Sequence, residues 1–327
     1  VEQAAADLNE ALGYSGSDQI KVLYNAPSGE EDMNEQVNIL DEELARYPDV
    51  IAIASIDEDA SEVQFDLAAG NDIPIVAFDS GNVYQGIQCT CKTDNSAATA
   101  EGVSKLCEAI GDSGEVSLIV HDSVSESARE REEAFKAALS AEHPEVTVAE
   151  TIYMDELDEI KKSAAAEQLG VSLEEIQAQQ AAETSDQGEE QTGEASAVME
   201  EINTAAEGMS DEEAVAYCMK KHPDLKGCFG TNVDATQLGV KALGSMEESD
   251  DVVLMGFDAG AAQHEALESG EIDGLVVQNP FGIGYAAVIA SARTVLEIGN
   301  EAQVNTGYIW VDQENLEEDA VQAMLYE

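Results

Sequence analysis

The chain has 327 residues, a length typical of about two domains. Its residues are 44% apolar, which is enough to form buried cores. Its 69 Asp and Glu residues against 14 Lys and Arg residues give a formal net charge of -55. Such a surface repels phosphate backbones and anionic lipid headgroups, and we expect no nucleic-acid partner. The chain has no apolar run of about 18 residues, so no membrane-spanning helix is predicted.

The first part of the chain alternates predicted helices with short apolar segments that are predicted to be strands. In order these are the helix Val1–Leu12, the strand Gln19–Tyr24, the helix Glu31–Tyr47, the strand Val50–Ser55, the helix Glu58–Gly70, and the strands Ile73–Phe78 and Gln85–Thr90. Strands that are apolar throughout are typical of a parallel sheet with helices on both faces.

A second set of alternating elements follows. It comprises the helix Ala97–Ile110, the strand Glu115–His121, the helix Ser127–Ala141, the strand Val146–Tyr153, the helix Ala214–His222, the strand Gly227–Thr231, the helix Asn232–Leu243, the strand Val252–Phe257, the helix Gln263–Ser269, the strand Gly274–Gln278 and a helix after Asn279-Pro280. Two such sets predict an α/β protein with two Rossmann-like, doubly wound parallel-sheet lobes.

Residues Glu156–Asp211 interrupt the second set with a segment rich in Ala, Glu and Gln. The pattern predicts helices over Asp158–Leu169, Leu173–Ala182 and Met199–Ala206, and a loop over Thr184–Glu194. We interpret the segment as an acidic helical insertion outside the sheet, partly disordered; a hairpin that docks a partner is the alternative.

No catalytic signature or metal-ligand spacing is present, so we expect no enzyme, no cofactor and no metal site. The spacing of the five Cys residues fits no zinc motif; Cys107, Cys218 and Cys228 are predicted to be buried thiols, and Cys89 and Cys91 share one face of a strand. His143 and His222 are predicted to be solvated helix caps, whereas His121 ends a strand and can face the crevice beyond it.

Polar side chains gather where predicted strands end or where the following helices begin. Ligands of open parallel sheets bind at this edge. Carboxylates, amides and a guanidinium suit a neutral polyhydroxylated ligand rather than a phosphate. For Asp258 the alternative is a helix cap, for Gln278 a turn, and for Arg129 and Arg131 an ion pair with neighbouring Glu residues. The set comprises Asp79, Asn95, Arg131, Asn232, Asp258 and Gln278.

Several motifs in this order and spacing resemble the type I periplasmic (solute-)binding proteins of sugar ABC importers, near the ribose-binding branch. The resemblance covers the chain except Glu156–Asp211. The motifs are Ile73-Pro-Ile-Val-Ala-Phe-Asp-Ser80, Asp94-Asn95, Arg129-Glu-Arg131, His222-Pro223 through Thr231-Asn232, Met255-Gly-Phe-Asp258 and Ile272-Asp-Gly-Leu-Val-Val-Gln-Asn-Pro280.

The resemblance implies a role for each matching residue. Asp79 and Asp258 accept hydrogen bonds from sugar hydroxyls, Phe257 lies against the sugar ring, and the remaining donors are Arg131, Asn232 and Gln278. It also implies hinge crossovers near Cys91–Thr93, Gln278–Asn279 and Asn305–Gly307. The family's first strand is missing from the first lobe of this chain.

The resemblance further implies a division of the chain into two lobes. The N-terminal lobe would comprise residues 1–91 and 279–305, and the C-terminal lobe residues 92–278 and 306–327, with 156–211 inserted in the latter. The implied protein is a monomeric, extracytoplasmic (periplasmic or lipid-anchored, cell-surface) solute-binding protein that delivers a monosaccharide to an ABC permease. The alternatives are the ligand-sensing domain of a LacI-type regulator or sensory receptor, and a nucleoside or polyol as ligand.

Overall fold

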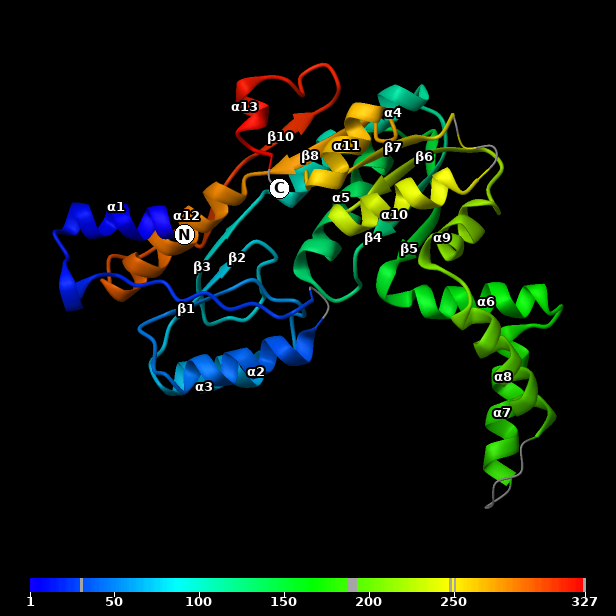
Figure 1. Ribbon diagram of the computed structural model, residues 1–327, viewed down its shortest axis with the longest axis horizontal. Coiled ribbons are helices and arrows are strands. Elements are labelled where there is room, and N and C mark those ends of the chain that lie inside the picture. The colour runs from blue at the N-terminus through cyan, green and yellow to red at the C-terminus, as the bar shows by residue number, and fades with distance from the viewer. Residues whose placement is uncertain (30–31, 187–192, 247–248, 250, 326–327) are drawn as a thin grey trace.

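The computed structural model describes residues 1–29, 32–186, 193–246, 249 and 251–325. Two α/β lobes lie side by side, and a helical arm projects from one of them (Figure 1). The predicted fold class of two lobes with parallel sheets is confirmed. Within the described residues, no helix combines the length and the apolar character needed to cross a membrane.

The first lobe contains a four-stranded parallel sheet in the order β1-β2-β3-β9. Its strands are β1 (Ile51–Ile53), β2 (Ile75–Phe78), β3 (Ile87–Lys92) and β9 (Gln303–Asn305). The helices α2 (Met33–Leu44) and α3 (Glu62–Gly70) enclose one core with the sheet, and α12 (Pro280–Val295) packs on β2 and β3. Helix α1 (Glu2–Leu12) packs on α12. The short 3-10 helix η1 (Gly16–Asp18) follows α1 in the chain.

The strand predicted over Gln19–Tyr24 is wrong. This segment forms no strand, and the Leu23 and Tyr24 side chains are 71% and 76% exposed. A strand requires a neighbour for its backbone N–H and C=O groups, and this segment pairs with none of the strands that the structure describes. The segment is instead held by Asn9, whose side chain bonds the backbone N and O of Ile20.

The second lobe contains a six-stranded sheet in the order β10-β8-β7-β6-β4-β5, parallel except for β10. Its strands are β4 (Gly114–Val120), β5 (Val146–Tyr153), β6 (Leu225–Gly230), β7 (Val253–Phe257), β8 (Gly274–Gln278) and β10 (Tyr308–Val311). Alternate residues of these strands enter two separate cores, one on each face.

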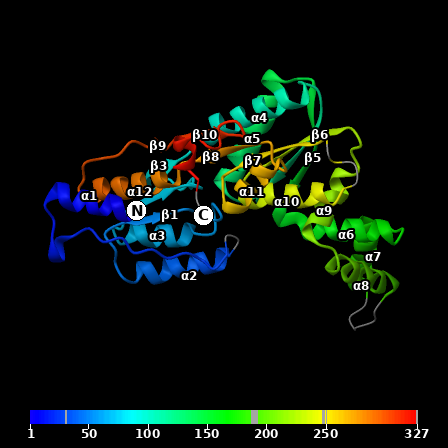
Figure 2. The ribbon, with the colours of Figure 1, turned by 45° about the horizontal axis from the view of Figure 1, so that its top comes forward.

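Helices cover both faces of this sheet (Figure 2). On one face lie α4 (Asn95–Ile110) and α5 (Glu126–Glu142), and on the other α9 (Asp211–Met219), α10 (Val233–Gly244) and α11 (Ala261–Ser269). The short α13 (Asp319–Gln322) follows β10 near the end of the chain. The buried strands therefore read as nearly continuous apolar runs, as the sequence predicted.

The chain passes between the two sheets three times: between β3 and α4, between β8 and α12, and between β9 and β10. Hydrogen bonds connect these crossovers. The Thr306 N–H donates to the Lys92 carbonyl (3.1 Å), and Asn279 Nδ2 donates to the Thr306 carbonyl (3.1 Å). The connections between the lobes therefore form one bonded unit.

The insertion after β5 is helical and largely outside the sheet. It begins with the 3-10 helix η2 (Met154–Glu156) and continues as α6 (Leu157–Gln168), α7 (Leu173–Asp186) and α8 (Glu194–Glu207). These three helices share a small apolar core of their own and project away from the lobe (Figure 1). Of the loop predicted over Thr184–Glu194, residues 184–186 belong to α7, Glu194 begins α8, and 187–192 lie outside the described residues. The expectation that part of the insertion is disordered remains a prediction.

Candidate functional site

Two aspartates end strands of different sheets in the same unusual backbone conformation. Asp79 follows β2 with φ 54°, and Asp258 follows β7 with φ 73°. Left-handed backbone is uncommon for residues other than Gly and marks positions that the surrounding structure holds in place. The two residues belong to different lobes, yet Asp258 lies near enough to Asp79 to influence its ionisation.

The ionisation of Asp79 reflects this shared environment. Burial raises the pKa of Asp79, the charge of Arg131 opposes that rise, and the charge of Asp258 adds to it. Part of the Asp79 surface remains accessible to solvent, but protein atoms surround the carboxyl group closely enough to desolvate it. A desolvated carboxylate beside a guanidinium is well suited to accept hydrogen bonds from an uncharged ligand.

Arg131 occupies the first turns of α5 and is only 4% exposed. Its Nε donates to Asn95 Oδ1 (3.0 Å), and its Nη1 donates to the Thr231 carbonyl. The guanidinium carbon lies 4.0 Å from the centre of the Phe257 ring, a cation–π contact. These contacts fix the planar donor group between α4, β6 and β7.

Gln278 connects the polar cluster to a crossover. Its Nε2 donates to Asp258 Oδ1 (2.7 Å), and its Oε1 accepts from Thr93 Oγ1 (2.8 Å). Asp258 is 8% exposed, so this bond satisfies a carboxylate that water reaches poorly. Of the predicted residues, the structure thus brings together Asp79, Asn95, Arg131, Phe257, Asp258 and Gln278.

Asn232 stands at the edge of this cluster. Its Oδ1 caps α10 by accepting from the Ala235 N–H (2.8 Å), so the donor role implied by the family resemblance would belong to its Nδ2. The neighbouring Thr231 hydroxyl contacts His121 Nδ1 (2.6 Å). Burial and the charge of Arg131 lower the pKa of His121 to about 3, so this side chain is neutral at physiological pH.

Helix α5 makes two connections to the first sheet and its loops that were not predicted from the sequence. Lys92, at the end of β3, is 3% exposed and donates from Nζ to Glu126 and Glu130 of α5. Burial acts to lower the pKa of Lys92, but the hydrogen bonds to these carboxylates outweigh it and leave the pKa raised, so Lys92 stays charged. A lysine directly after an apolar strand, in a chain with few basic residues, was the available signal.

Arg129 is the second connection between the lobes. Its guanidinium pairs with both carboxylate oxygens of Glu58, which lies in the loop after β1. The Glu58 N–H also reaches the Val124 carbonyl (3.4 Å). Arg129 therefore pairs with a Glu, but its partner is Glu58 of the other lobe and not one of the neighbouring Glu residues of the alternative interpretation.

The histidines predicted to be solvated caps are partly buried against carboxylates. The side chain of His143 is 14% exposed and bonds Asp112, while that of His222 is 23% exposed and lies between Glu115 and Glu150. All five cysteines are buried, including the predicted Cys107, Cys218 and Cys228. Cys89 and Cys91 share a face of β3, with their sulfurs 3.8 Å apart.

A cavity of about 480 Å³ lies elsewhere, beside α1 in the first lobe. Glu2, Asn9 and Gln19 contribute polar groups to its lining, but Asn9 is already bonded to the backbone of Ile20. None of the predicted site residues lines it. The interlobe cluster, where carboxylates and a guanidinium converge, is therefore the stronger candidate site.

The sequence matches a family model described as a periplasmic binding protein domain, over residues 1–184 and 180–299. No curated protein matches the chain.

Solved structures with the same fold include three bacterial solute-binding proteins. A carbohydrate transporter solute-binding protein from Agrobacterium radiobacter, in complex with D-arabinose, has a TM-score of 0.72 and 22% identity, with 99% of this chain and 92% of that chain covered. An ABC transporter solute-binding protein from Agrobacterium vitis with bound D-fucose has a TM-score of 0.72 and 19% identity, with 99% and 94% covered. A second A. vitis protein, bound to α-D-tagatopyranose, has a TM-score of 0.71 and 24% identity, with 100% and 93% covered.

Proposed function

The chain belongs to the periplasmic binding protein domain family, and from this premise we propose that it is an extracytoplasmic solute-binding protein. In this proposal it binds a small polyhydroxylated ligand between its two lobes and delivers the ligand to the permease of an ABC importer. It acts as a monomer, and its role is binding rather than catalysis.

The observation that carries this proposal is the convergence of Asp79 from one lobe with Arg131 and Asp258 from the other. Carboxylates accept hydrogen bonds and the guanidinium donates several in one plane, a combination that suits neighbouring hydroxyl groups. The proposed ligand-binding residues are Asp79, Asn95, Arg131, Asn232, Phe257, Asp258 and Gln278.

The ligand we propose is a monosaccharide. The solved proteins with the same fold are bound to D-arabinose, D-fucose and α-D-tagatopyranose, which are neutral and carry several hydroxyls. The buried, already paired Arg131 and the flanking carboxylates disfavour an anionic ligand in the same place.

We further propose that the lobes, divided as the sequence suggested, open and close about the three crossovers as the ligand binds and leaves. The bonded crossovers and the ion pair between Arg129 and Glu58, which lie on different lobes, support a closed arrangement in this structure. A ligand that contacts both lobes favours that arrangement, because it interacts more strongly with the closed state.

The alternatives are a LacI-type regulator or sensory receptor built on the same core, and a nucleoside or polyol in place of a sugar. The charge of -55 disfavours a protein that docks on DNA. The sequence that precedes the domain in the gene would separate a secreted protein from a DNA-binding one.

Thermal-shift measurements on the purified chain test the proposal directly. The panel contains D-arabinose, D-fucose, D-tagatose, adenosine, sorbitol and glucose 6-phosphate. We expect at least one monosaccharide to raise the melting temperature, since a ligand that binds only the folded state stabilises it by mass action. The shift should be absent in Asp258→Asn and Arg131→Met and intact in Arg293→Ala, which changes an exposed arginine of α12. Stabilisation by the phosphate ester alone would contradict the proposal.

A further inference from the structure

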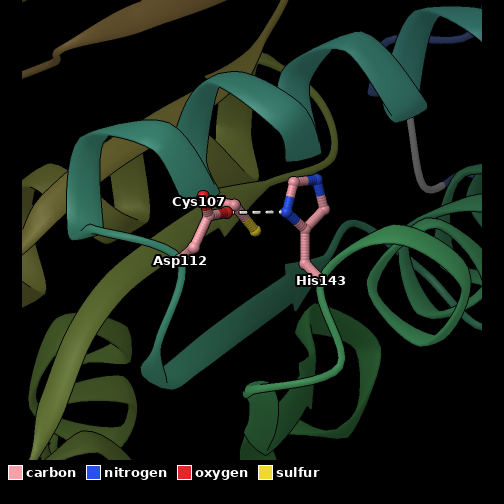
Figure 3. A group of neighbouring side chains, drawn as sticks. All are labelled: Cys107, Asp112 and His143. Carbon is pink, nitrogen blue, oxygen red and sulfur yellow. Dashed lines mark hydrogen bonds and ion pairs between the residues drawn. The ribbon is translucent and has the colours of Figure 1, made fainter.

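A second cluster of chemically distinct side chains lies at the far end of α4 from the interlobe site. Cys107 is in the last turns of α4, Asp112 is in the turn before β4, and His143 ends α5 (Figure 3). Asn95 begins α4 at the interlobe cluster, so Cys107 is about 18 Å further along the helix axis. The cluster is therefore separate from the site that the proposed function uses.

The packing of two helices brings these residues together. α4 and α5 lie against each other on one face of the sheet, which places their C-terminal ends side by side. Asp112 has left-handed backbone (φ 53°), and its N–H donates to the Cys107 carbonyl at 2.7 Å. The His143 Nδ1 then lies 2.8 Å from Asp112 Oδ1.

One sulfur, one nitrogen and one oxygen of these residues all lie within 4.8 Å of one another. Their exposure is graded: Cys107 is 0% exposed, the His143 side chain 14% and the Asp112 side chain 65%. Asp112 is therefore the side from which an ion would approach the cluster.

A catalytic interpretation of the same residues fits poorly. A nucleophilic cysteine needs an accessible sulfur and a lowered pKa. Cys107 is fully buried, and burial together with the charge of Asp112 raises the pKa of its thiol to about 11. Moreover, His143 Nδ1, the imidazole nitrogen within the cluster, is already bonded to Asp112 Oδ1.

We propose that Cys107, Asp112 and His143 bind one Zn²⁺ ion. Thiolate, imidazole and carboxylate are the protein ligands that zinc takes, and three of them leave a fourth tetrahedral position for water. The two anionic ligands balance the dication. Hard cations such as Ca²⁺ and Mg²⁺ avoid sulfur and prefer oxygen ligands. The residues are 5 and 31 positions apart in sequence, a spacing that matches no zinc motif and explains why the sequence predicted no metal site.

Binding follows a balanced exchange: Zn²⁺ forms a bond to the Cys107 sulfur, and the thiol proton leaves to solvent. Zinc affinity should therefore rise about tenfold for each unit of pH, since the thiol is protonated across the neutral range. The bound ion would also connect the ends of α4 and α5 and raise the melting temperature of the protein.

The test is calorimetric titration of the reduced, chelator-treated full chain with Zn²⁺, in buffer containing millimolar Ca²⁺ to occupy surface carboxylates. We expect one equivalent to bind, and Cys107→Ser and His143→Gln to weaken that binding by more than about 100-fold, because loss of an outer-shell partner alone costs about 10- to 100-fold. Asp112→Ala changes an exposed side chain and so leaves the fold intact, and it should weaken binding as well. His222→Gln is the matched control, as His222 also contacts two carboxylates but no thiol cluster.

Titration with Co²⁺ provides a spectroscopic readout of sulfur ligation. A thiolate ligand gives an intense sulfur-to-cobalt charge-transfer band, which carboxylates and imidazoles alone do not give. This band should appear with one equivalent and be missing in Cys107→Ser. Absence of the band, absence of Zn²⁺ binding, or binding by Asp112→Ala and His143→Gln equal to that of the unaltered chain would each overturn the proposal.

Discussion

Gln278 donates a hydrogen bond from Nε2 to Oδ1 of Asp258 across 2.7 Å. The same side chain accepts from Thr93, so one amide joins a proposed ligand-binding carboxylate to two of the three crossovers between the lobes. A group in this position can couple ligand binding to lobe closure, because a change in Asp258 alters the bonding of the crossover next to it.

The first prediction concerns that coupling. Gln278→Ala leaves the buried Asp258 carboxylate and the Thr93 hydroxyl each without a partner, at a cost of about 1–3 kcal/mol. We expect the affinity for the stabilising monosaccharide to fall by about 5- to 150-fold, as measured by calorimetry.

Thr93→Val separates coupling from direct contact. Thr93 bonds Gln278 but is not among the proposed ligand-binding residues, so a smaller loss of affinity is expected if the crossover matters. Thr294→Val removes a hydroxyl whose partners are the Ala290 carbonyl and the Asn300 side chain, neither of which lies at a crossover, and it should leave the affinity unchanged. Equal affinities for Thr93→Val and Thr294→Val would argue against the coupling.

The second prediction concerns Lys92, a buried cation shared by Glu126 and Glu130. Lys92→Met removes the cation, which leaves Glu126 without its partner and Glu130 with only the Asn95 amide, and this should lower the free energy of unfolding by about 3–5 kcal/mol. Urea denaturation of the ligand-free protein measures this change.

Lys136→Met is the matched control for Lys92. Lys136 also pairs with a glutamate of α5, but its side chain is 46% exposed. Exposed pairs contribute about 0–1 kcal/mol, so this variant should unfold nearly as the unaltered protein does. A similar loss in both variants would mean that the burial of Lys92 has no special importance.

The third prediction follows from the raised pKa of Asp79. An acid whose pKa is raised by folding contributes stability that is complete below its unfolded pKa and is lost as pH rises through the folded pKa. Asp79→Asn has no such proton to lose. Its melting temperature without ligand should therefore rise relative to that of the unaltered protein as the pH increases above about 4, the unfolded pKa of an Asp.

The control for this prediction is Asp72→Asn. Asp72 has nearly the same left-handed backbone (φ 58°) but is exposed. A pH-dependent gain in Asp72→Asn equal to that in Asp79→Asn would place its cause in the backbone and not in the ionisation of Asp79. Asp79→Asn should also bind the monosaccharide more weakly, since a carboxylate acceptor is lost.

The fourth prediction concerns the ion pair between Arg129 and Glu58, which connects the lobes. Arg129→Ala should weaken ligand binding by about 2- to 5-fold, because a partly exposed ion pair contributes about 0–1 kcal/mol to the closed state. Exchange of the charges in Glu58→Arg/Arg129→Glu should restore it. Small-angle scattering of the ligand-free protein should show a larger radius of gyration for Arg129→Ala.

Salt and a second arginine test this interpretation. The difference between Arg129→Ala and the unaltered protein should shrink at about 1 M salt, where the Debye length is about 3 Å. Arg46→Ala breaks an exposed ion pair within the first lobe and should not change the scattering. A salt-independent loss of affinity would point to packing of the Arg129 side chain instead.

The fold was predictable because its signals are local. Apolar runs such as Ile75–Phe78 and Gly274–Gln278 alternate with amphipathic helices, and this alternation predicts parallel sheets covered on both faces. Polar residues after these runs, among them Asp79 and Asp258, are placed at one edge of each sheet by the geometry of parallel strands alone. The family motifs added the role expected of each of these residues in ligand binding.

Segment 19–24 shows where local signals fail. Its pattern predicts a strand, but strand formation depends on backbone hydrogen bonds with a neighbour, and the segment pairs with none of the described strands. Three of its large hydrophobic residues, Val22, Leu23 and Tyr24, are exposed.

The sequence by itself determined the two α/β lobes and the strand ends at which Asp79, Asp258 and Gln278 lie. Only the tertiary structure decided which side chains meet: Arg131 with Phe257, Arg129 with Glu58, and the thiol of Cys107 with Asp112 and His143. Periodicity is a property of neighbours in the chain, whereas these contacts depend on how helices and lobes pack across many residues. This packing sets the charge, burial and bonding partners of each side chain, and these properties distinguish a binding residue from a solvated one.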